Sequence, residues 1–191
     1  QAKELCTVSI AHTTADYDKA IAAFDQGITH ATHLFNAMNG IHHRKPGVVG
    51  AVMDDDRVRG ELICDGFHIH PAVLRMAFRV LGDRALIVSD SMRANGMQEG
   101  DSYDLGGQMV QVSGGKAVLA DGTIAGSVSN LHQEVKNLVA YGVPFAQAVK
   151  SASLIPAKAI GLDHEIGSIA PGKRADLLVL DEKLDMTAVY H

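Results

Sequence analysis

Side chains that can ligate a metal or move a proton follow four apolar, strand-like runs of this chain. His12 and His33 each come directly after such a run, and His68 and Asp90 follow two more. When parallel strands lie side by side, their carboxyl ends meet at one edge of the sheet or barrel. This feature constrains the fold to one in which four strand ends share a rim, and it predicts a site on that rim.

The residue types at this rim match those that a metal-dependent hydrolase requires. Neutral imidazoles such as His12 and His33 can hold a divalent ion, and a carboxylate such as Asp90 can move the proton of its bound water. Taken singly, each residue also has a plain structural explanation. A histidine at a strand end is commonly a hydrogen-bonded rim residue, and an aspartate there commonly caps the next element. The coincidence of four such positions favours the metal site.

Strand-like and helix-like segments alternate along the first part of the chain, which is the rhythm of repeated strand–helix–strand units. The expected elements, in chain order, are a strand over 4–10, a helix over 17–24, a strand over 29–33, a loop over 34–50, a strand over 57–63, a helix over 71–81, a strand over 85–88, a hairpin near 108–119, and helices over 128–140 and 144–153 followed by a helical turn from 156. Ser127 or Ser129 is the expected cap of the helix over 128–140.

Residues 166–191 change character, because two strand-like segments follow a turn with no helix between them. Strands that arrive after an array of strand–helix units suggest a small separate β layer.

The loop over 34–50 carries a compact basic cluster, His42-His43-Arg44-Lys45, in a chain whose net charge is −5. The forked guanidinium of Arg44 suits a phosphate. A solvated basic loop explains the cluster equally well on composition alone.

Charge and composition exclude several classes of partner. A net charge of −5 and an isoelectric point near 6.0 argue against a nucleic-acid partner or an anionic membrane surface. The longest apolar runs are too short to span a bilayer, and no signal segment opens the chain. Cys6 and Cys64 lie in apolar runs without metal-site spacing, so both are interpreted as reduced core residues of a cytoplasmic protein.

Several runs of residues resemble one family closely. They are Thr32-His33-Leu34-Phe35-Asn36-Ala37-Met38, Arg44-x-Pro46-Gly47, Asp65-Gly66-Phe67-His68, Val88-Ser89-Asp90-Ser91 and Gly122-Thr123-Ile124-Ala125-Gly126-Ser127. In this order and spacing they resemble the N-acetylglucosamine-6-phosphate deacetylases of the amidohydrolase superfamily. The segment 167–177 is similar to a tail found across that superfamily. The match runs along nearly the whole chain, but it covers only the later half of the family protein.

The resemblance implies an α/β fold in two parts. Residues 1–165 would form the later half of a (β/α)8 TIM-type barrel, with a β-hairpin insertion near 108–119, and residues 166–191 the C-terminal strands of a small β-sandwich domain. A complete barrel takes about 250 residues, so the chain looks like a fragment. The earlier half of the family protein supplies a metal-binding glutamate and further substrate contacts. Without it, one apolar sheet face is expected to lie uncovered, and the expected partners are the missing half and a second copy in a homodimer.

The resemblance also implies roles for individual residues. His12 and His33 would be metal ligands, for zinc in the first place, although iron, cobalt or nickel also suit such ligands. Asp90 would be the catalytic acid/base. The implied substrate contacts are Asn36 and Ala37 on the sugar phosphate, Arg44 on the phosphate, within the chain or across a subunit boundary, and Asp65, Gly66, Phe67, His68, Ile124, Ala125 and Gly126 around the sugar.

The implied reaction is hydrolysis of the acetamide of N-acetylglucosamine 6-phosphate, which yields glucosamine 6-phosphate and acetate. Because catalytic zinc generally has three protein ligands, the isolated chain is expected to bind metal weakly and to be a poor enzyme. Two alternatives stay open: another amidohydrolase, such as a cyclic amidase that needs no phosphate clamp, and a non-catalytic module that binds sugar phosphates.

Overall fold

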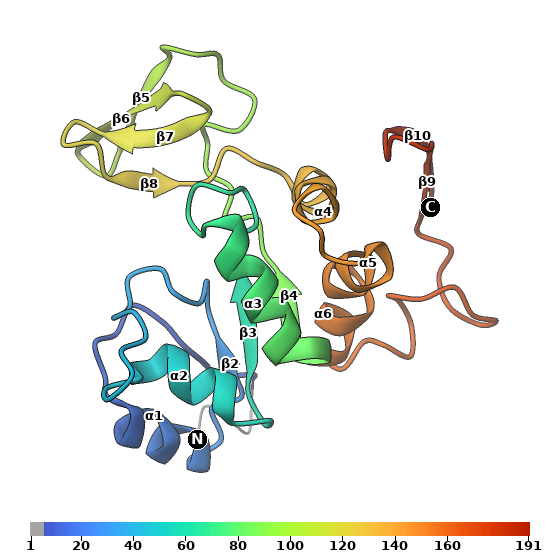
Figure 1. Ribbon diagram of the computed structural model, residues 1–191. Coiled ribbons are helices and arrows are strands. Elements are labelled where there is room, and N and C mark those ends of the chain that lie inside the picture. The colour runs from blue at the N-terminus through green and yellow to red at the C-terminus, as the bar shows by residue number, and fades with distance from the viewer. Residues whose placement is uncertain (1–5) are drawn as a thin grey trace.

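A parallel sheet with helices between its strands forms the centre of the computed structural model, which describes residues 6–191 (Figure 1). The strands lie in chain order, and β2 pairs in parallel with both β1 and β3. Parallel neighbours require crossover connections, and here each connection contains a helix. The predicted α/β fold is confirmed. The elements are β1 (Ser9–Ile10), α1 (Tyr17–Asp25), β2 (His30–Ala31), α2 (Gly47–Asp54), β3 (Arg59–Leu62), α3 (Pro71–Leu81) and β4 (Ala85–Ile87).

Local sequence signals explain where α1 and α3 begin. The Asp16 carboxylate accepts a hydrogen bond of 2.9 Å from the backbone N–H of Lys19 at the start of α1. Pro71 occupies the first turn of α3, where its missing N–H is harmless. Both helices were predicted within a residue of their observed ends. The first strand is shorter than predicted, and residues 4 and 5 of that prediction lie outside the described residues.

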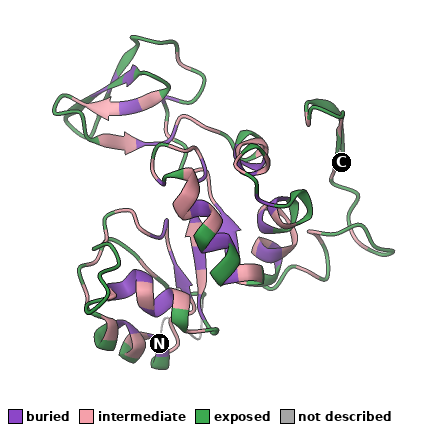
Figure 2. Ribbon diagram, in the orientation of Figure 1, coloured by how far each residue is buried: buried purple, intermediate pink, exposed green. Residues whose placement is uncertain are grey.

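The predicted loop over 34–50 is wrong at its end, because α2 begins at Gly47. Val48, Val49, Ala51 and Val52 are all buried, and purple alternates with pink along this helix in Figure 2. A short helix that is apolar on most sides shows no polar stripe, so its sequence lacks the alternation that marks an amphipathic helix.

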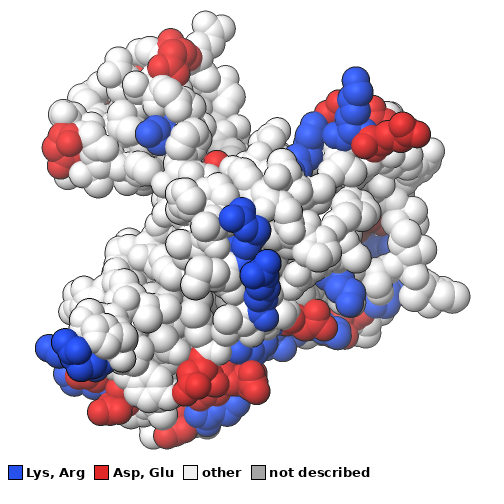
Figure 3. All heavy atoms as spheres, in the orientation of Figure 1, with Lys and Arg blue, Asp and Glu red and all other residues white. Residues whose placement is uncertain are grey.

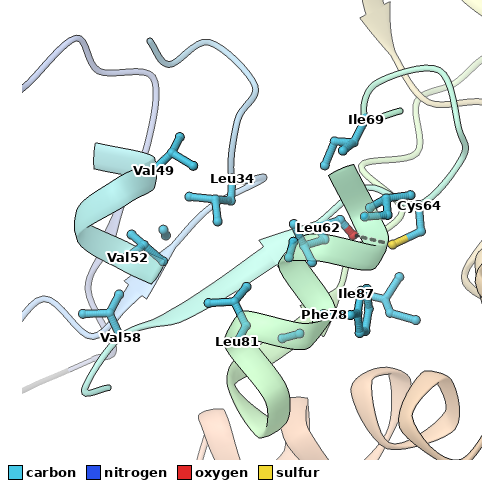
Figure 4. Close-up of a cluster of buried hydrophobic side chains, with 14 of the residues drawn as sticks. Leu34, Val49, Val52, Val58, Leu62, Cys64, Ile69, Phe78, Leu81 and Ile87 are labelled. Atoms are coloured by element: carbon cyan, nitrogen blue, oxygen red, sulfur yellow. Dashed lines mark hydrogen bonds between the residues drawn. The ribbon is translucent and has the colours of Figure 1, made fainter. Parts of the chain in front are cut away.

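The main core lies between β3 and the helices α2 and α3 (Figure 4). A Cβ added at Gly60 would lie 3.1 Å from the side chain of Leu34 and 3.2 Å from that of Leu81, so this face of β3 packs tightly. Side chains alternate along a strand, which puts Arg59 and Glu61 on the opposite face. The expectation of an apolar uncovered face is therefore wrong for β3, which presents charged groups there.

Arg84 ties the end of α2 to the start of β4. Its guanidinium donates to the carbonyls of Val52, Met53, Asp55 and Val58 at 2.7, 3.0, 3.1 and 2.9 Å. These carbonyls belong to the last turn of α2 and the turn after it, which have no partners within the helix. One half-buried side chain thus closes the α2–β3 connection.

An antiparallel sheet is inserted after β4 and stands apart at one end of the molecule (Figure 1). The predicted hairpin is confirmed as its two central strands, but the outer two strands were missed. Its own small core contains Tyr103, Val110, Val112 and Ala117. The strands are β5 (Ser102–Leu105), β6 (Gln108–Ser113), β7 (Lys116–Leu119) and β8 (Ile124–Gly126).

The remaining elements are α4 (Leu131–Ala140), α5 (Phe145–Ala152), α6 (Leu154–Ala159) and the antiparallel pair β9 (Leu177–Leu180) and β10 (Met186–Tyr190). Asn130, and neither of the predicted serines Ser127 and Ser129, caps α4: its side-chain oxygen accepts from the N–H of Gln133 at 2.9 Å. None of the helices in residues 6–191 is long and apolar enough to cross a membrane.

The two cysteines differ in their surroundings. Cys64 is fully buried, as predicted, and burial raises the pKa of its thiol. Cys6 is exposed, so its interpretation as a core residue is wrong. It lies three residues before the two-residue strand β1, outside the packed part of the sheet.

Candidate active site

His12 and His33 meet at the edge of the sheet where the parallel strands end. Each lies two residues beyond its strand, β1 or β2. Their Nε2 atoms are 2.9 Å apart, and the rings meet edge to face at 73° with centroids 4.7 Å apart. His33 is buried, with 8% of its surface exposed, whereas His12 faces solvent.

The backbone at this edge is strained at three of the proposed functional residues. His12, His33 and Asp90 have φ values of 44°, 30° and 45°, which side chains other than glycine rarely adopt. Such conformations persist where surrounding contacts hold them, and they cluster at functional sites. At His33 the carbonyl accepts two hydrogen bonds from Asn36, at 3.0 Å from its N–H and 3.2 Å from its side-chain amide.

The histidine pair fits two corners of a metal site. Nitrogens that each lie about 2.0–2.1 Å from one zinc ion, at angles of about 90–110°, are about 2.9–3.4 Å apart. The Nε2 atoms of His12 and His33 match the lower end of this range. Within residues 6–191, however, no three histidine, cysteine or acidic side chains are grouped as a complete metal site. The described residues thus bring together two of the side chains that such a site would need.

Glu61 is a neighbour of this site that the sequence reading missed. Burial raises the pKa of its carboxyl, the backbone N–H and charge of His33 lower it, and the charge of Asp90 raises it. Glu61 therefore lies within electrostatic range of both His33 and Asp90. Its place on the predicted strand over 57–63, two residues before the carboxyl end, was the available signal.

Asp90 is anchored by the inserted sheet. Its carbonyl accepts from the N–H of Ser127 at 3.2 Å, and the Ser127 carbonyl accepts from Met92 at 2.9 Å. A Cβ at Gly126 would lie 2.2 Å from the sulfur of Met92, so a larger residue here would require the Met92 side chain to move. Gly126 belongs to the predicted sugar-binding run and ends β8, so it lies beside Asp90. Asp90 itself is exposed.

The loop after β3 carries a close pair formed by Asp65 and His68. Asp65 Oδ2 lies 2.7 Å from His68 Nδ1, and Asp65 Oδ1 accepts from the N–H groups of Phe67 and His68 at 2.9 and 3.0 Å. Burial alone would raise the pKa of Asp65, but the hydrogen bonds from His68 and Phe67 outweigh it and lower the pKa. Phe67 is exposed, and the ammonium of Lys116 lies 5.0 Å above its ring, so the β6–β7 turn reaches this loop.

Space-filling atoms show a hollow between the lobe of the inserted sheet and the lobe of α1 and α2 (Figure 3). The sheet edge at which β3 ends points toward this hollow in Figure 1. On the face drawn, basic and acidic side chains are interspersed and form no continuous basic surface.

Arg44 lies in a different setting. It is exposed, and its Nη1 is 2.7 Å from His43 Nε2. A cavity of about 310 Å³ beside it is also lined by Asp16, Tyr17, Asp18 and residues 45–47. Among the described residues, no hydrogen bond or ion pair joins Arg44 to the histidine pair or to Asp90. The described residues therefore show no direct contact between this predicted phosphate ligand and the histidine pair.

The residues before Arg44 lie closer to the site. Asn36 is half-buried and bonded to His33, as described above. Ala37 is exposed and has a φ of 52°, so its backbone also takes the left-handed conformation.

Comparisons with known proteins identify the family of this chain. The Amidohydrolase family model matches residues 2–190. N-acetylgalactosamine-6-phosphate deacetylase of Escherichia coli O157:H7 is 40% identical over 184 residues, covering 96% of this chain and 48% of that protein. The crystal structure of N-acetylglucosamine-6-phosphate deacetylase from Pasteurella multocida matches with a TM-score of 0.92 and 38% identity, over 96% of this chain and 48% of that one.

A mutant of the Mycobacterium smegmatis N-acetyl-D-glucosamine-6-phosphate deacetylase was solved in complex with N-acetyl-D-glucosamine-6-phosphate. It matches with a TM-score of 0.90 and 41% identity, over 96% of this chain and 49% of that one. The chain spans about half the length of these relatives. The resemblance predicted from runs such as 32–38 and 65–68 is confirmed, and the chain belongs to the amidohydrolase family.

Proposed function

We propose that the protein carrying this chain hydrolyses the acetamide of N-acetylglucosamine 6-phosphate to glucosamine 6-phosphate and acetate. The observation that carries the proposal is the pair of Nε2 atoms of His12 and His33, 2.9 Å apart at the sheet edge that also bears Asp90. The deacetylases of known structure that this chain resembles at 38–41% identity support the choice of substrate.

Amide hydrolysis needs an activated water and a proton for the leaving nitrogen. We assign both proton transfers to Asp90, which accepts a proton from the attacking water and returns it to the glucosamine nitrogen as the C–N bond breaks. His12 and His33 would hold a divalent ion, zinc in the first place, with iron, cobalt or nickel as alternatives. Such an ion, when bound, supplies Lewis acidity at the acetyl carbonyl and makes water more acidic.

The substrate contacts in this proposal come from the loops around the histidine pair. Asn36 and Ala37 follow His33 and would contact the sugar phosphate. The segments Asp65–His68 and Ile124–Gly126 would line the sugar. The charges of Asp65 and Asp90 both raise the pKa of Glu134, and Ile124–Gly126 leads into Ser127, whose N–H donates to the Asp90 carbonyl. Arg44 would bind the phosphate of a second copy's substrate, since no polar contact in the described chain joins it to its own site.

The proposed assembly follows from what the chain lacks. We propose that β1–β4 are part of a (β/α)8 barrel, that the missing half supplies the third metal ligand, and that β9 and β10 belong to a small β sandwich. The resulting units are residues 1–165 and 166–191. A homodimer would place Arg44 at a neighbouring site. We also propose a cytoplasmic location, consistent with the buried thiol of Cys64.

One second substrate has support of its own. The E. coli O157:H7 relative is named for N-acetylgalactosamine 6-phosphate, which differs at one hydroxyl of the sugar. Both sugar phosphates therefore belong in the assays.

The test combines zinc titration, sugar-phosphate binding and acetate release. We expect weak zinc binding that His33→Ala abolishes, zinc-dependent binding of N-acetylglucosamine 6-phosphate that survives Asp90→Asn, and little or no acetate release by the isolated chain. A chain that binds neither sugar phosphate in the presence of zinc would refute the function. Turnover comparable to that of a complete deacetylase would refute the claim that two histidines form an incomplete site.

A cyclic amidase and a non-catalytic module make different predictions. A cyclic amidase needs no phosphate ligand, so Arg44→Ala would leave it active. In a non-catalytic module Asp90→Asn would change nothing, whereas in the deacetylase assembled with its missing half it abolishes turnover and spares binding.

A further inference from the structure

Three side chains on one face of α4 bond to the backbone just after β3. Glu134 Oε2 accepts from the N–H of Cys64 at 3.0 Å, and Asn137 Nδ2 donates to the Cys64 carbonyl at 3.2 Å. The Tyr141 hydroxyl donates to the Asp65 carbonyl at 3.4 Å. Residues three and four apart share a helix face. One face of α4 therefore holds both polar backbone groups of Cys64 and the carbonyl of the next residue.

The loop also approaches this end of α4 closely. Gly66 has a φ of +82°, and a Cβ there would lie 2.2 Å from the Tyr141 hydroxyl oxygen. Arg75 of α3 donates to the Tyr141 carbonyl at 3.1 Å, which ties the end of α4 to a second helix. The position of the loop is thus fixed by bonding and by contact.

The segment held in this way carries the Asp65–His68 pair. Three contacts converge on the Asp65 carboxylate, one from the His68 ring and two from backbone N–H groups. The ring of His68 therefore follows the position of the Asp65 backbone, whose carbonyl is bonded to Tyr141.

A glutamate is unusual at position 134, because this position lies in the core. Glu134 is fully buried, neighbours Val135 and Leu138 in the core, and its Oε1 has no hydrogen-bond partner among the described residues. Burying a carboxyl with an unsatisfied oxygen is costly, and an apolar side chain would avoid that cost. What an apolar side chain would not supply is the bond to Cys64.

We propose that Glu134, Asn137 and Tyr141 are positioning residues that hold the loop after β3, so that the Asp65–His68 pair is fixed for binding the sugar. The identity of the sugar rests on the proposed function. The positioning itself rests on the contacts above.

The first test measures the loop directly. Glu134→Met keeps the side-chain length and removes the acceptor, whereas Glu134→Gln keeps a carbonyl oxygen for the Cys64 N–H. Gln147→Met is the matched control, because it removes a 2.9 Å bond from α5 to a backbone carbonyl of α3. Amide hydrogen exchange by NMR is followed at Cys64 and His68. We expect exchange there to be about tenfold faster in Glu134→Met than in the control. In Glu134→Gln we expect it to be as slow as in the wild type. Equal exchange in Glu134→Met and the control overturns the proposal.

The second test measures binding of N-acetylglucosamine 6-phosphate to the zinc-loaded chain. We expect Glu134→Met to weaken it about tenfold, with Gln147→Met and Glu134→Gln near wild type. Faster exchange without weaker binding overturns the role in sugar binding. If the wild-type chain binds no sugar phosphate, the proposed function fails, and the exchange rates still decide whether α4 holds the loop.

Discussion

Stability should fall as pH rises through neutrality, because of one buried carboxyl. Burial raises the pKa of Glu134 from 4.5 to about 8, and the N–H of Cys64 opposes the shift only in part. Between these two pH values the folded state holds a proton that the unfolded state has released. The free energy of unfolding therefore decreases with rising pH. Glu134's contribution is fully present below pH 4.5 and is lost as pH rises through 8.

The magnitude follows from the size of the shift. Each pH unit in this window changes the free energy of unfolding by about 1.4 kcal/mol per group, so the full window amounts to about 5 kcal/mol. That is a large share of the roughly 5–15 kcal/mol that stabilises a typical domain. The side chain is fully buried, so solvent does not screen this contribution.

Glu134→Gln isolates the effect, because glutamine keeps an oxygen for Cys64 and does not titrate. Other groups act in the same pH range: burial lowers the pKa of His30, which makes stability rise with pH below about 6.5. They act equally in both proteins, so they cancel in the difference. Urea unfolding of the two proteins by circular dichroism, from pH 5 to 9 at constant ionic strength, gives that difference. We expect the free energy of unfolding of Glu134→Gln, relative to that of the wild type, to increase steadily as pH rises. A change smaller than about 1.4 kcal/mol over this range would refute a strongly raised pKa.

Three further predictions concern the scaffold and the site. Arg84→Met should lower the free energy of unfolding by about 2–4 kcal/mol in urea unfolding, since four carbonyls lose a charged donor; a loss below about 1 kcal/mol would contradict this. Gly66→Ala should cost about 2–3 kcal/mol through its positive φ and its clash with Tyr141, and adding Tyr141→Phe should recover part of the loss. Asn36→Ala should weaken zinc binding about tenfold in calorimetry by removing one of the two hydrogen bonds to the His33 carbonyl, whereas Asn95→Ala, which removes a bond to Ser129, should leave it unchanged; equal affinities would count against this support.

The sequence predicted those parts of the fold and site that depend on local pattern. Alternation of strand and helix gave the parallel sheet, and placement at strand ends gave the meeting of His12 with His33. The helix α2 was not predicted, because the segment from Val48 to Val52 is apolar on most sides and shows no helical alternation of apolar and polar residues. The strands β5 and β8 were missed because β5 is mostly exposed and β8 is three residues long and ends in a glycine.

Glu61 and Glu134 show a different limit of sequence reading. Each is a carboxylate in a segment that also carries other polar side chains, and such a residue commonly points to solvent. Whether it does depends on which face of the strand or helix the rest of the chain covers. That is decided by contacts between distant residues, such as the bond of 3.0 Å between Glu134 and the N–H of Cys64, 70 positions earlier. Arg84 is a similar case, since its carbonyl partners precede it by 26 to 32 positions.

The hydrogen bonds that hold the candidate site share one pattern, and this pattern determines which substitutions the site tolerates. Three groups near the sheet edge are held by a segment that comes later in the chain: His33 by Asn36, Asp90 by Ser127, and the backbone of Asp65 by Tyr141. Residues in left-handed backbone cost about 1–3 kcal/mol each unless neighbours hold them. Asp90 and the Asp65–His68 pair therefore keep their geometry only while the inserted sheet and α4 are packed in place. Substitutions far from the histidines, in β8 or on α4, should alter binding before they alter the fold.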